Sequence, residues 1–191
     1  MATQDAILHA KECFKAGLPI PAGTVRPVIL ESWLRCRTQG VPMEDGDKRI
    51  LPPAEVETRI EARRALCEVA VPYVQTLYDF IKGSEFKVLL SDEEGYILYE
   101  QGDPEIMEIA KRGGLVKGAC RSEQRLGTNG IGTVLVNRRP LQVFGAEHYY
   151  ETHNHWACSG APILLPDGSL GGSICLSGMA EKVTDHTLGM G

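Results

Sequence analysis

The sequence has none of the features that mark a membrane or secreted protein. Its 191 residues contain no run of about twenty apolar residues that could span a bilayer. The first residues, MATQDAILHAKECF, include acidic and polar side chains where a secretory signal needs a basic start and an unbroken apolar run. The six cysteines form no C-x-x-C pair, which favours reduced thiols. We therefore expect a cytoplasmic protein without membrane contacts.

The sequence also has fewer basic than acidic residues. The 20 Lys and Arg residues are outnumbered by 25 Asp and Glu residues, giving a formal net charge of -5. This balance gives no electrostatic reason for the chain itself to bind nucleic acid. With 43% hydrophobic and 24% charged residues, the composition is that of an ordinary globular protein. The length predicts one main domain with a smaller appendage.

The signatures of several enzyme classes are missing. No Gly-Lys-Ser/Thr ends a P-loop, and neither H-E-x-x-H nor G-x-S-x-G occurs. Cys158, followed by Ser159 and Gly160 with His155 nearby, is similar to a nucleophile with its base, but no orienting acid completes a triad. We therefore expect a protein that is not an enzyme and needs no cofactor.

The first part of the chain has helical patterns. Helices are predicted over 5–16 and 27–38, and a longer one over 54–82. In the long helix apolar residues recur every seven positions, as Ile60, Cys67, Val74 and Ile81. We expect Pro72 to kink this helix and its apolar stripe to pack on its own domain or in a dimeric bundle.

From Phe86 onward the apolar period changes from about 3.6 residues to 2, which indicates strands. FKVLLS and YILYEQ flank the turn 92–95 as a hairpin, and APILL and SLGGSICLS flank a second turn at 166–168. A helix at 104–112, a helix ending near 137 and the strand LQVFG lie between them. The predicted class is α+β, an antiparallel sheet covered by helices.

We divide the chain into a helical segment, 1–52, and a sensor-like domain, 53–191. The second part comprises the entry helix 54–82, a sheet core over 86–178 and an exit helix that begins near 184. Because that last helix simply stops, the chain looks cut from something longer.

The segment GTNGIGT (127–133) leads into a helix. Thr128 or Asn129 is expected to cap that helix, while Gly130 and Gly132 let it approach the sheet closely. Free amides near Thr128 could also bind a polar group of a ligand.

The segment FGAEHYYETHNHWACSGAPI (144–163) gathers histidines and aromatic residues. If 147–155 is helical, His148 and His155 share a face but lie two turns apart, roughly 10.5 Å, too far to chelate one ion together. A metal or haem-type site using His155, Cys158 and His148 stays an alternative. The large rings of Tyr149, Tyr150 and Trp156 predict either a pocket wall or closure of the core.

Four blocks of sequence carry a resemblance to a known family. They are VRPVILESWLRCRTQGV (25–41), SEQRLGTNGIGTVLVNRRPLQVFGAEHYYETHNHWACSGAPI (122–163), PDGSLGGSICLSG (166–178) and the terminal HTLGM. Together they closely resemble the N-terminal sensory region of the acetoin-catabolism-regulator family of bacterial sigma-54-dependent transcriptional activators. The resemblance implies a GAF domain preceded by helices. It also implies an ATPase domain and a DNA-binding helix-turn-helix elsewhere in the protein.

The resemblance implies a sensor, and we expect a small organic effector between the sheet and covering helices at 103–112, 128–137 and 147–156. Where family members often carry Trp, this chain has Arg121, which suggests a polar or anionic effector group if it faces the pocket. The expected partners are a second copy of the chain and, through domains that the chain lacks, sigma-54 polymerase and DNA. The predicted contacts are Arg121, Thr128, Phe144, His148, Tyr149, His155, Trp156 and Cys158.

Overall fold

The computed structural model describes residues 2–44 and 49–183. Its helices are α1 (Gln4–Lys15), α2 (Pro27–Thr38), α3 (Pro53–Ala62), α4 (Arg64–Ile81), α5 (Pro104–Arg112), α6 (Glu123–Leu126) and α7 (Gly132–Asn137). Its strands are β1 (Phe86–Asp92), β2 (Ile97–Gly102), β3 (Leu141–Phe144), β4 (Trp156–Leu164) and β5 (Leu170–Met179). Three short 3-10 turns, η1 (Gly145–Glu147), η2 (Glu151–His153) and η3 (Ala180–Lys182), complete the fold.

The strands form one five-stranded sheet in the order β2-β1-β5-β4-β3. Every neighbouring pair is antiparallel. The two predicted hairpins, β1–β2 and β4–β5, meet where β1 pairs with β5, so the α+β prediction is confirmed. The tight first turn is closed by Asp92, whose Oδ1 accepts hydrogen bonds from the backbone N–H groups of Glu94 and Tyr96.

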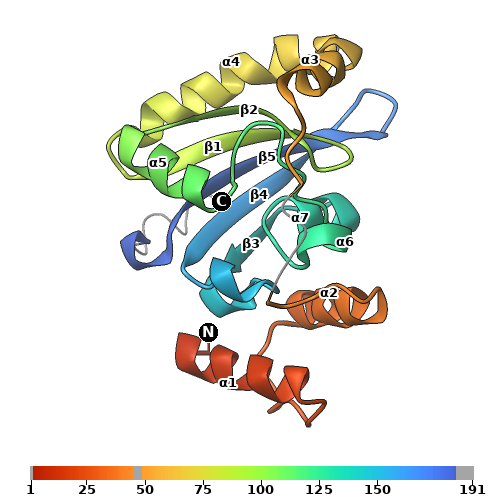
Figure 1. The fold of residues 1–191 in the computed structure, drawn as a ribbon, viewed down its shortest axis with the longest axis vertical. Helices are drawn as coiled ribbons and strands as arrows, with labels where there is room; N and C mark the ends of the chain where they lie inside the picture. Colours follow the sequence, from red (N-terminus) through yellow and green to blue (C-terminus); the bar gives the residue numbers. More distant parts are fainter. Residues whose placement is uncertain (1, 45–48, 184–191) are drawn as a thin grey trace.

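Both faces of the sheet are apolar and both are covered (Figure 1). Because side chains alternate along a strand, Val88 and Leu90 of β1 face α4, whereas Leu89 faces the opposite side. On that opposite side the cover comes from α5, α7 and the segments around them, through Ile106 and Ile131. The candidate site lies on the side of the sheet that α5 and α7 cover.

The N-terminal helices pack against the β3 end of the sheet rather than on either face (Figure 1). Phe14 of α1 and Trp33 of α2 share a core with Val143 and Tyr149. The indole N–H of Trp33 donates to the backbone oxygen of Glu147 at 2.9 Å. The predicted helices 5–16 and 27–38 are confirmed to within a residue.

The predicted continuous helix over 54–82 is wrong, because the chain breaks between α3 and α4. Arg63 leaves helical geometry, with φ -121° and ψ 29°. Its guanidinium binds Glu93 in the β1–β2 turn, a long-range contact that fixes the break. Pro72, where we predicted a kink, lies inside α4. The break thus occurs at a tertiary ion pair rather than at the proline.

The predicted helix over 147–156 is also wrong. The segment consists of η1, η2 and the start of β4. The backbone N–H of Tyr149 donates to the Thr128 oxygen, and that of Glu151 to the Met43 oxygen. Since these donors bind distant carbonyls, the i to i-4 bonds of an α-helix cannot form. His148 and His155 therefore do not share a helical face.

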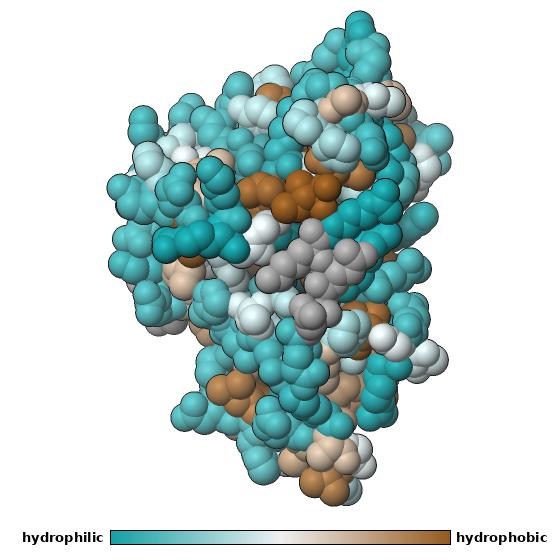
Figure 2. All heavy atoms as spheres, viewed as in Figure 1, coloured by the Kyte–Doolittle hydropathy of each residue, from teal (hydrophilic) through white to brown (hydrophobic). Residues whose placement is uncertain are grey.

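The surface drawn in Figure 2 is mainly hydrophilic, with apolar residues in small separate patches. Within residues 2–44 and 49–183, no helix combines the length and the apolar character needed to traverse a bilayer. The predicted exit helix from about 184 lies outside the described residues.

Candidate ligand-binding cavity

A cavity of about 30 Å³ lies between the sheet and the segments that cover it. Four of the eight predicted contacts line it: Arg121, His148, Trp156 and Cys158. The other residues that line it are Gly113, Leu115, Asn129, Gly130, Ile131, His153, Cys175 and Ser177. This volume holds water molecules but not an organic effector, so binding of an effector requires the walls to move.

The sheet side of the cavity carries two thiols and a hydroxyl. Cys158 of β4 lies opposite Ser177 of β5, and Cys175 is two residues earlier on the same face. The Ser177 hydroxyl lies 3.3 Å from the Cys158 Sγ and 3.5 Å from the Cys175 Sγ. These three small polar groups allow the sheet wall of the cavity to form hydrogen bonds with water or a ligand.

An imidazole and a thiol meet at this wall. His148 is buried, and its Nδ1 lies 3.0 Å from the backbone oxygen of Gly145, which leaves Nε2 for the cavity side. A hydrogen bond from Cys175 and the charge of the His148 imidazole lower the pKa of Cys158 well below its ordinary value. The same contact with Cys158, together with burial, raises the pKa of Cys175. Any negative charge at the wall therefore resides on Cys158, next to the His148 imidazole.

Arg121 enters the cavity as a buried cation. Its side chain is 4% exposed, and its Nε has no hydrogen-bond partner. Burial lowers the pKa of its guanidinium to about 10, which still leaves it charged at neutral pH. No carboxylate in the described parts of the chain pairs with it. Arg121 therefore faces the cavity.

The Asn129–Gly130 segment forms the floor of the cavity. The Asn129 Oδ1 accepts hydrogen bonds from the backbone N–H groups of Ile131 and Gly132 at 2.9 Å. The N-cap residue of α7 is Ile131, so Asn129 supports the start of the helix from two residues before the cap. A Cβ added at Gly130 would overlap the Cys158 Cβ. Gly130 therefore allows this segment to lie directly on the sheet, which agrees with the prediction.

A loop over 113–118 closes the cavity from above. The buried Lys87 Nζ donates to the Leu115 backbone oxygen at 2.8 Å and to the Glu100 Oε2 at 2.6 Å. The Glu100 Oε1 in turn accepts the Lys117 backbone N–H. One ion pair therefore anchors the loop at two points, and Leu115 lies over the cavity.

Four predicted contacts lie elsewhere. Thr128 is fully buried, and its hydroxyl lies 2.6 Å from the Ser32 hydroxyl of α2. Tyr149 packs on Gly127 and edge-on to Phe14, so it belongs to the core. His155 is exposed, and its ring lies beside the Trp156 ring. Each is placed by backbone contacts that a helical reading of 147–156 could not anticipate.

Phe144, the fourth, lines a separate hollow of about 500 Å³ between the N-terminal helices and β3. This hollow is larger, but its charged groups are already paired. Arg26 donates to both Glu147 carboxylate oxygens, at 2.7 and 2.6 Å. We therefore take the smaller cavity, which Arg121 enters without a carboxylate partner among the described residues, as the candidate site.

The alternative metal site is not assembled. In the part of the chain that the structure describes, no group of three or more His, Cys, Asp or Glu side chains is placed to hold a metal ion. His148 and Cys158 lie together at the cavity, whereas His155 is exposed. The donor set proposed from sequence is therefore divided between two places.

Sequence reasoning missed the second strand of the sheet wall. Cys175 and Ser177 alternate with Ile174 and Leu176, which the apolar pattern assigned to an inner face. That alternation was the available signal. Small polar residues at every second position of a strand that is covered on both faces indicate a wall that faces a ligand or water.

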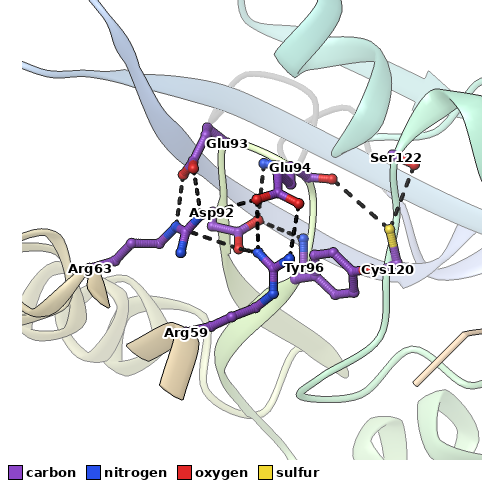
Figure 3. Close-up of polar contacts among 8 residues, drawn as sticks. All are labelled: Arg59, Arg63, Asp92, Glu93, Glu94, Tyr96, Cys120 and Ser122. Atoms are coloured by element: carbon purple, nitrogen blue, oxygen red, sulfur yellow. Dashed lines mark hydrogen bonds and ion pairs between the residues drawn. The ribbon is translucent and has the colours of Figure 1, made fainter. Parts of the chain in front are cut away.

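The turn between β1 and β2 binds two arginines of the α3–α4 region through its carboxylates (Figure 3). The Arg121 backbone N–H donates to the Gly95 oxygen at 2.8 Å. In the same turn, Asp92 and Glu94 bind the Arg59 guanidinium of α3 at 2.7 and 2.9 Å. Arg63 completes the cluster through Glu93.

The fold is shared with a solved structure. Over 86% of this chain and 56% of the other, it superposes with a TM-score of 0.80 on a chain from the crystal structure of the E. coli DhaR(N)-DhaL complex, at 20% sequence identity. The likeness agrees with the predicted fold class, an antiparallel sheet covered by helices with an N-terminal helical extension.

Residues 3–190 match the family model of the MimR N-terminal domain, and the chain belongs to that family. It is 37% identical over 167 residues to the acetoin dehydrogenase operon transcriptional activator AcoR of Bacillus subtilis, covering 87% of this chain and 28% of the relative. A signal-transduction and transcriptional-control protein of Clostridium beijerinckii is 33% identical over 168 residues, 87% of this chain and 27% of the relative. The propane 2-monooxygenase operon activator MimR of Mycolicibacterium goodii is 30% identical over 159 residues, 83% of this chain and 26% of the relative. The chain thus spans about a quarter of the length of these regulators.

Proposed function

We propose that this chain is the ligand-sensing domain of a sigma-54-dependent transcriptional activator and that a small organic effector binds in the cavity beside Arg121. The observation that carries the proposal is the convergence of polar groups from three parts of the chain, Arg121, His148 and Cys158, on one cavity. Membership of a family of activator N-terminal domains supports it. The relatives are described as regulators of transcription, and an enzymatic role is not proposed.

Binding would open the cavity and then hold it in a second conformation. The loop over 113–118 is the wall best suited to move, since it begins at Gly113–Gly114. Its movement would break the hydrogen bonds that join Leu115 to Lys87 and Lys117 to Glu100. An effector changes the sensor only through its different affinities for the two conformations. A preference of about a hundredfold, roughly 2.7 kcal/mol, is a typical coupling.

The signal would leave through the acidic turn. The segment at Arg121 is bonded to Gly95, and the turn holds Arg59 and Arg63 at the α3–α4 junction. A shift of this segment would therefore alter the angle between α3 and α4. In the whole protein that movement would reach an ATPase domain that acts on sigma-54 polymerase at DNA.

The entry helix α4 would pack against a second copy of the chain. Val69, Tyr73 and Phe80 recur at helical spacing on α4 and are 65%, 65% and 82% exposed. Large exposed apolar side chains in a row are typical of interaction surfaces. A homodimer formed here would place two α3–α4 junctions close to the shared axis. Light scattering of the wild type and of a Tyr73→Glu, Phe80→Glu variant tests this, and a monomeric wild type would contradict it.

The sensor proposal is tested by a thermal-shift screen of small alcohols, ketones, diols, amines and short acids. We expect at least one saturable stabiliser, because a ligand that binds only the native state raises its stability by mass action. Trp156→Ala should abolish the shift, whereas Phe144→Ala, in the other hollow, should retain it. If both variants respond like the wild type, the effector binds elsewhere.

Transmission is tested by hydrogen exchange with the stabiliser found in that screen. In the wild type we expect the effector to change amide protection at the α3–α4 junction as well as around the cavity. Arg59→Gln combined with Arg63→Gln should remove the change at the junction and leave the change at the cavity. An unaltered response of the junction in the double variant would contradict the proposed route.

A further inference from the structure

We infer that the effector is an organic anion whose carboxylate pairs with the Arg121 guanidinium. This inference rests on the proposed function and specifies the chemical class of the ligand. The first step is the burial of the cation. Arg121 is 4% exposed at the cavity, and a charge removed from water costs several kcal/mol unless it is paired.

The protein itself does not supply the counter-charge. The carboxylates of the neighbouring segments that the structure describes already bind other cations. Glu123 binds Arg35 at 2.8 Å, Glu147 binds Arg26 at 2.6 Å, and Glu100 binds Lys87 at 2.6 Å.

The thiols near Arg121 offset its burial only in part. Burial lowers the pKa of the Arg121 guanidinium to about 10 and outweighs the opposite effect of the Cys158 and Cys120 thiols. Arg121 therefore brings to the cavity a positive charge that no carboxylate of the described residues balances. The Arg121 Nε is buried and has no hydrogen-bond partner, so the guanidinium is not satisfied by the described residues.

The shape of the site favours a carboxylate over a larger inorganic anion. A guanidinium offers parallel N–H donors that match the two oxygens of a carboxylate. The remaining walls include Leu115, Ile131 and Trp156, which suit a short apolar body. Arg121 is the one Arg or Lys side chain among the described residues that line this cavity, so it can balance the single charge of a carboxylate but not the double charge of a phosphate.

The experiment compares each carboxylate with its uncharged amide. Acetate, lactate and butyrate are titrated against acetamide, lactamide and butyramide by calorimetry and thermal shift at constant ionic strength. We expect at least one carboxylate to bind the wild type about tenfold or more tightly than its amide, because hydrogen bonds between charged groups are the stronger ones. A parallel titration with sodium chloride measures the response to a simple anion.

The matched variants are Arg121→Met and Arg139→Met. Arg121→Met keeps an unbranched apolar side chain and removes the charge, so the preference for carboxylate should vanish. Arg139 is exposed in the turn after α7, and its replacement should leave the preference intact. Should Arg121→Met not fold, a crystal structure of the wild type with the tightest carboxylate must show its oxygens within hydrogen-bond distance of the guanidinium.

The outcomes separate this inference from the proposed function. If amides or other neutral compounds bind as tightly as the carboxylates, the anion inference is wrong but the sensor proposal stands. If chloride alone reproduces the carboxylate response, or the preference survives Arg121→Met, the inference is likewise overturned. If none of these carboxylates stabilises the protein but a neutral compound of the wider thermal-shift screen does, only the anion inference fails. If no compound of either experiment stabilises the protein, both proposals fail.

Discussion

The acidic turn, residues 92–95, and the cavity beside Arg121 both have arginine charges out of bulk water. They differ in whether those charges have carboxylate partners. In the turn, Asp92 is fully buried and two guanidiniums, from Arg59 and Arg63, reach it (Figure 3). In the cavity, Arg121 is as deeply buried but meets no carboxylate of the described chain. Both guanidiniums at the turn therefore have carboxylate partners, whereas Arg121 has none among the described residues.

This difference separates a structural site from a candidate binding site. A buried ion pair is weak evidence for added stability, but removal of one partner is costly because the other is left unpaired in a low-dielectric environment. In the turn this cost would arise only after mutation. At Arg121 the native protein already has this cost of an unpaired buried charge, as expected of a binding site without its ligand.

The largest expected effect is at Asp92. Asp92→Ala removes the buried carboxylate from Arg59 and Arg63 and also the acceptor of two turn N–H groups. We expect the free energy of unfolding to fall by about 3 to 5 kcal/mol, the range for a broken buried pair. Urea denaturation measures it. A loss below about 1 kcal/mol would mean that Glu93 and Glu94 hold the junction without Asp92.

How far the sequence could predict this arrangement depends on the range of the interactions. The β1–β2 hairpin follows from local information, a period of two around an acidic turn that ends in glycine. The break at Arg63 does not, since its cause is Glu93, thirty residues later. Likewise the helix predicted over 147–156 does not form, because its N–H groups donate to the distant carbonyls of Thr128 and Met43. The local sequence pattern contains no information about these acceptors.

The same limit applies to the cavity. Arg121, His148, Trp156 and Cys158 were predicted from the composition of two segments and from a family resemblance, and the structure brings them together. Their roles in binding stay predictions. Thr128 and Tyr149 come from the same segments but face the N-terminal helices. This distinction is set by tertiary contacts, such as the hydrogen bond from the Tyr149 N–H to the Thr128 oxygen, and not by sequence spacing.

The second effect concerns Lys11, a buried cation that donates to the His148 oxygen at 2.5 Å and to the Asn154 Oδ1 at 2.8 Å. Burial lowers the pKa of Lys11 from 10.5 to about 8. Between these values the unfolded chain binds more protons than the folded one, so the free energy of unfolding should rise with pH. Below about pH 8 the contribution is a constant cost.

The gain from Lys11 should reach at most about 3 kcal/mol near pH 10.5, at roughly 1.4 kcal/mol per pH unit. The measurement is the difference in unfolding free energy between the wild type and Lys11→Met, followed from pH 7 to 10.5. Groups that titrate equally in both proteins cancel in that difference. A flat difference would show that Lys11 is not desolvated as its burial indicates.

The third effect has the opposite sign to the first. Without ligand, Arg121→Met should leave the free energy of unfolding unchanged or raise it by about 1 kcal/mol, because an apolar side chain replaces a buried unpaired charge. The measurement is urea denaturation in a buffer free of carboxylates. A loss of several kcal/mol would mean that Arg121 has an internal counter-charge and that the contrast with the acidic turn does not hold.

The smallest effect lies within the turn itself, at Glu94. Its side chain is 54% exposed, although it binds the same Arg59 as the buried Asp92. Exposed ion pairs are screened by solvent and contribute little, so Glu94→Gln should change the free energy of unfolding by less than about 0.5 kcal/mol. Added salt should remove even that difference, whereas the effect of Asp92→Ala should persist. If Glu94→Gln lowered the free energy of unfolding as much as Asp92→Ala, burial would not determine the contribution of a charge to stability. The same argument from burial could then not be applied to Arg121.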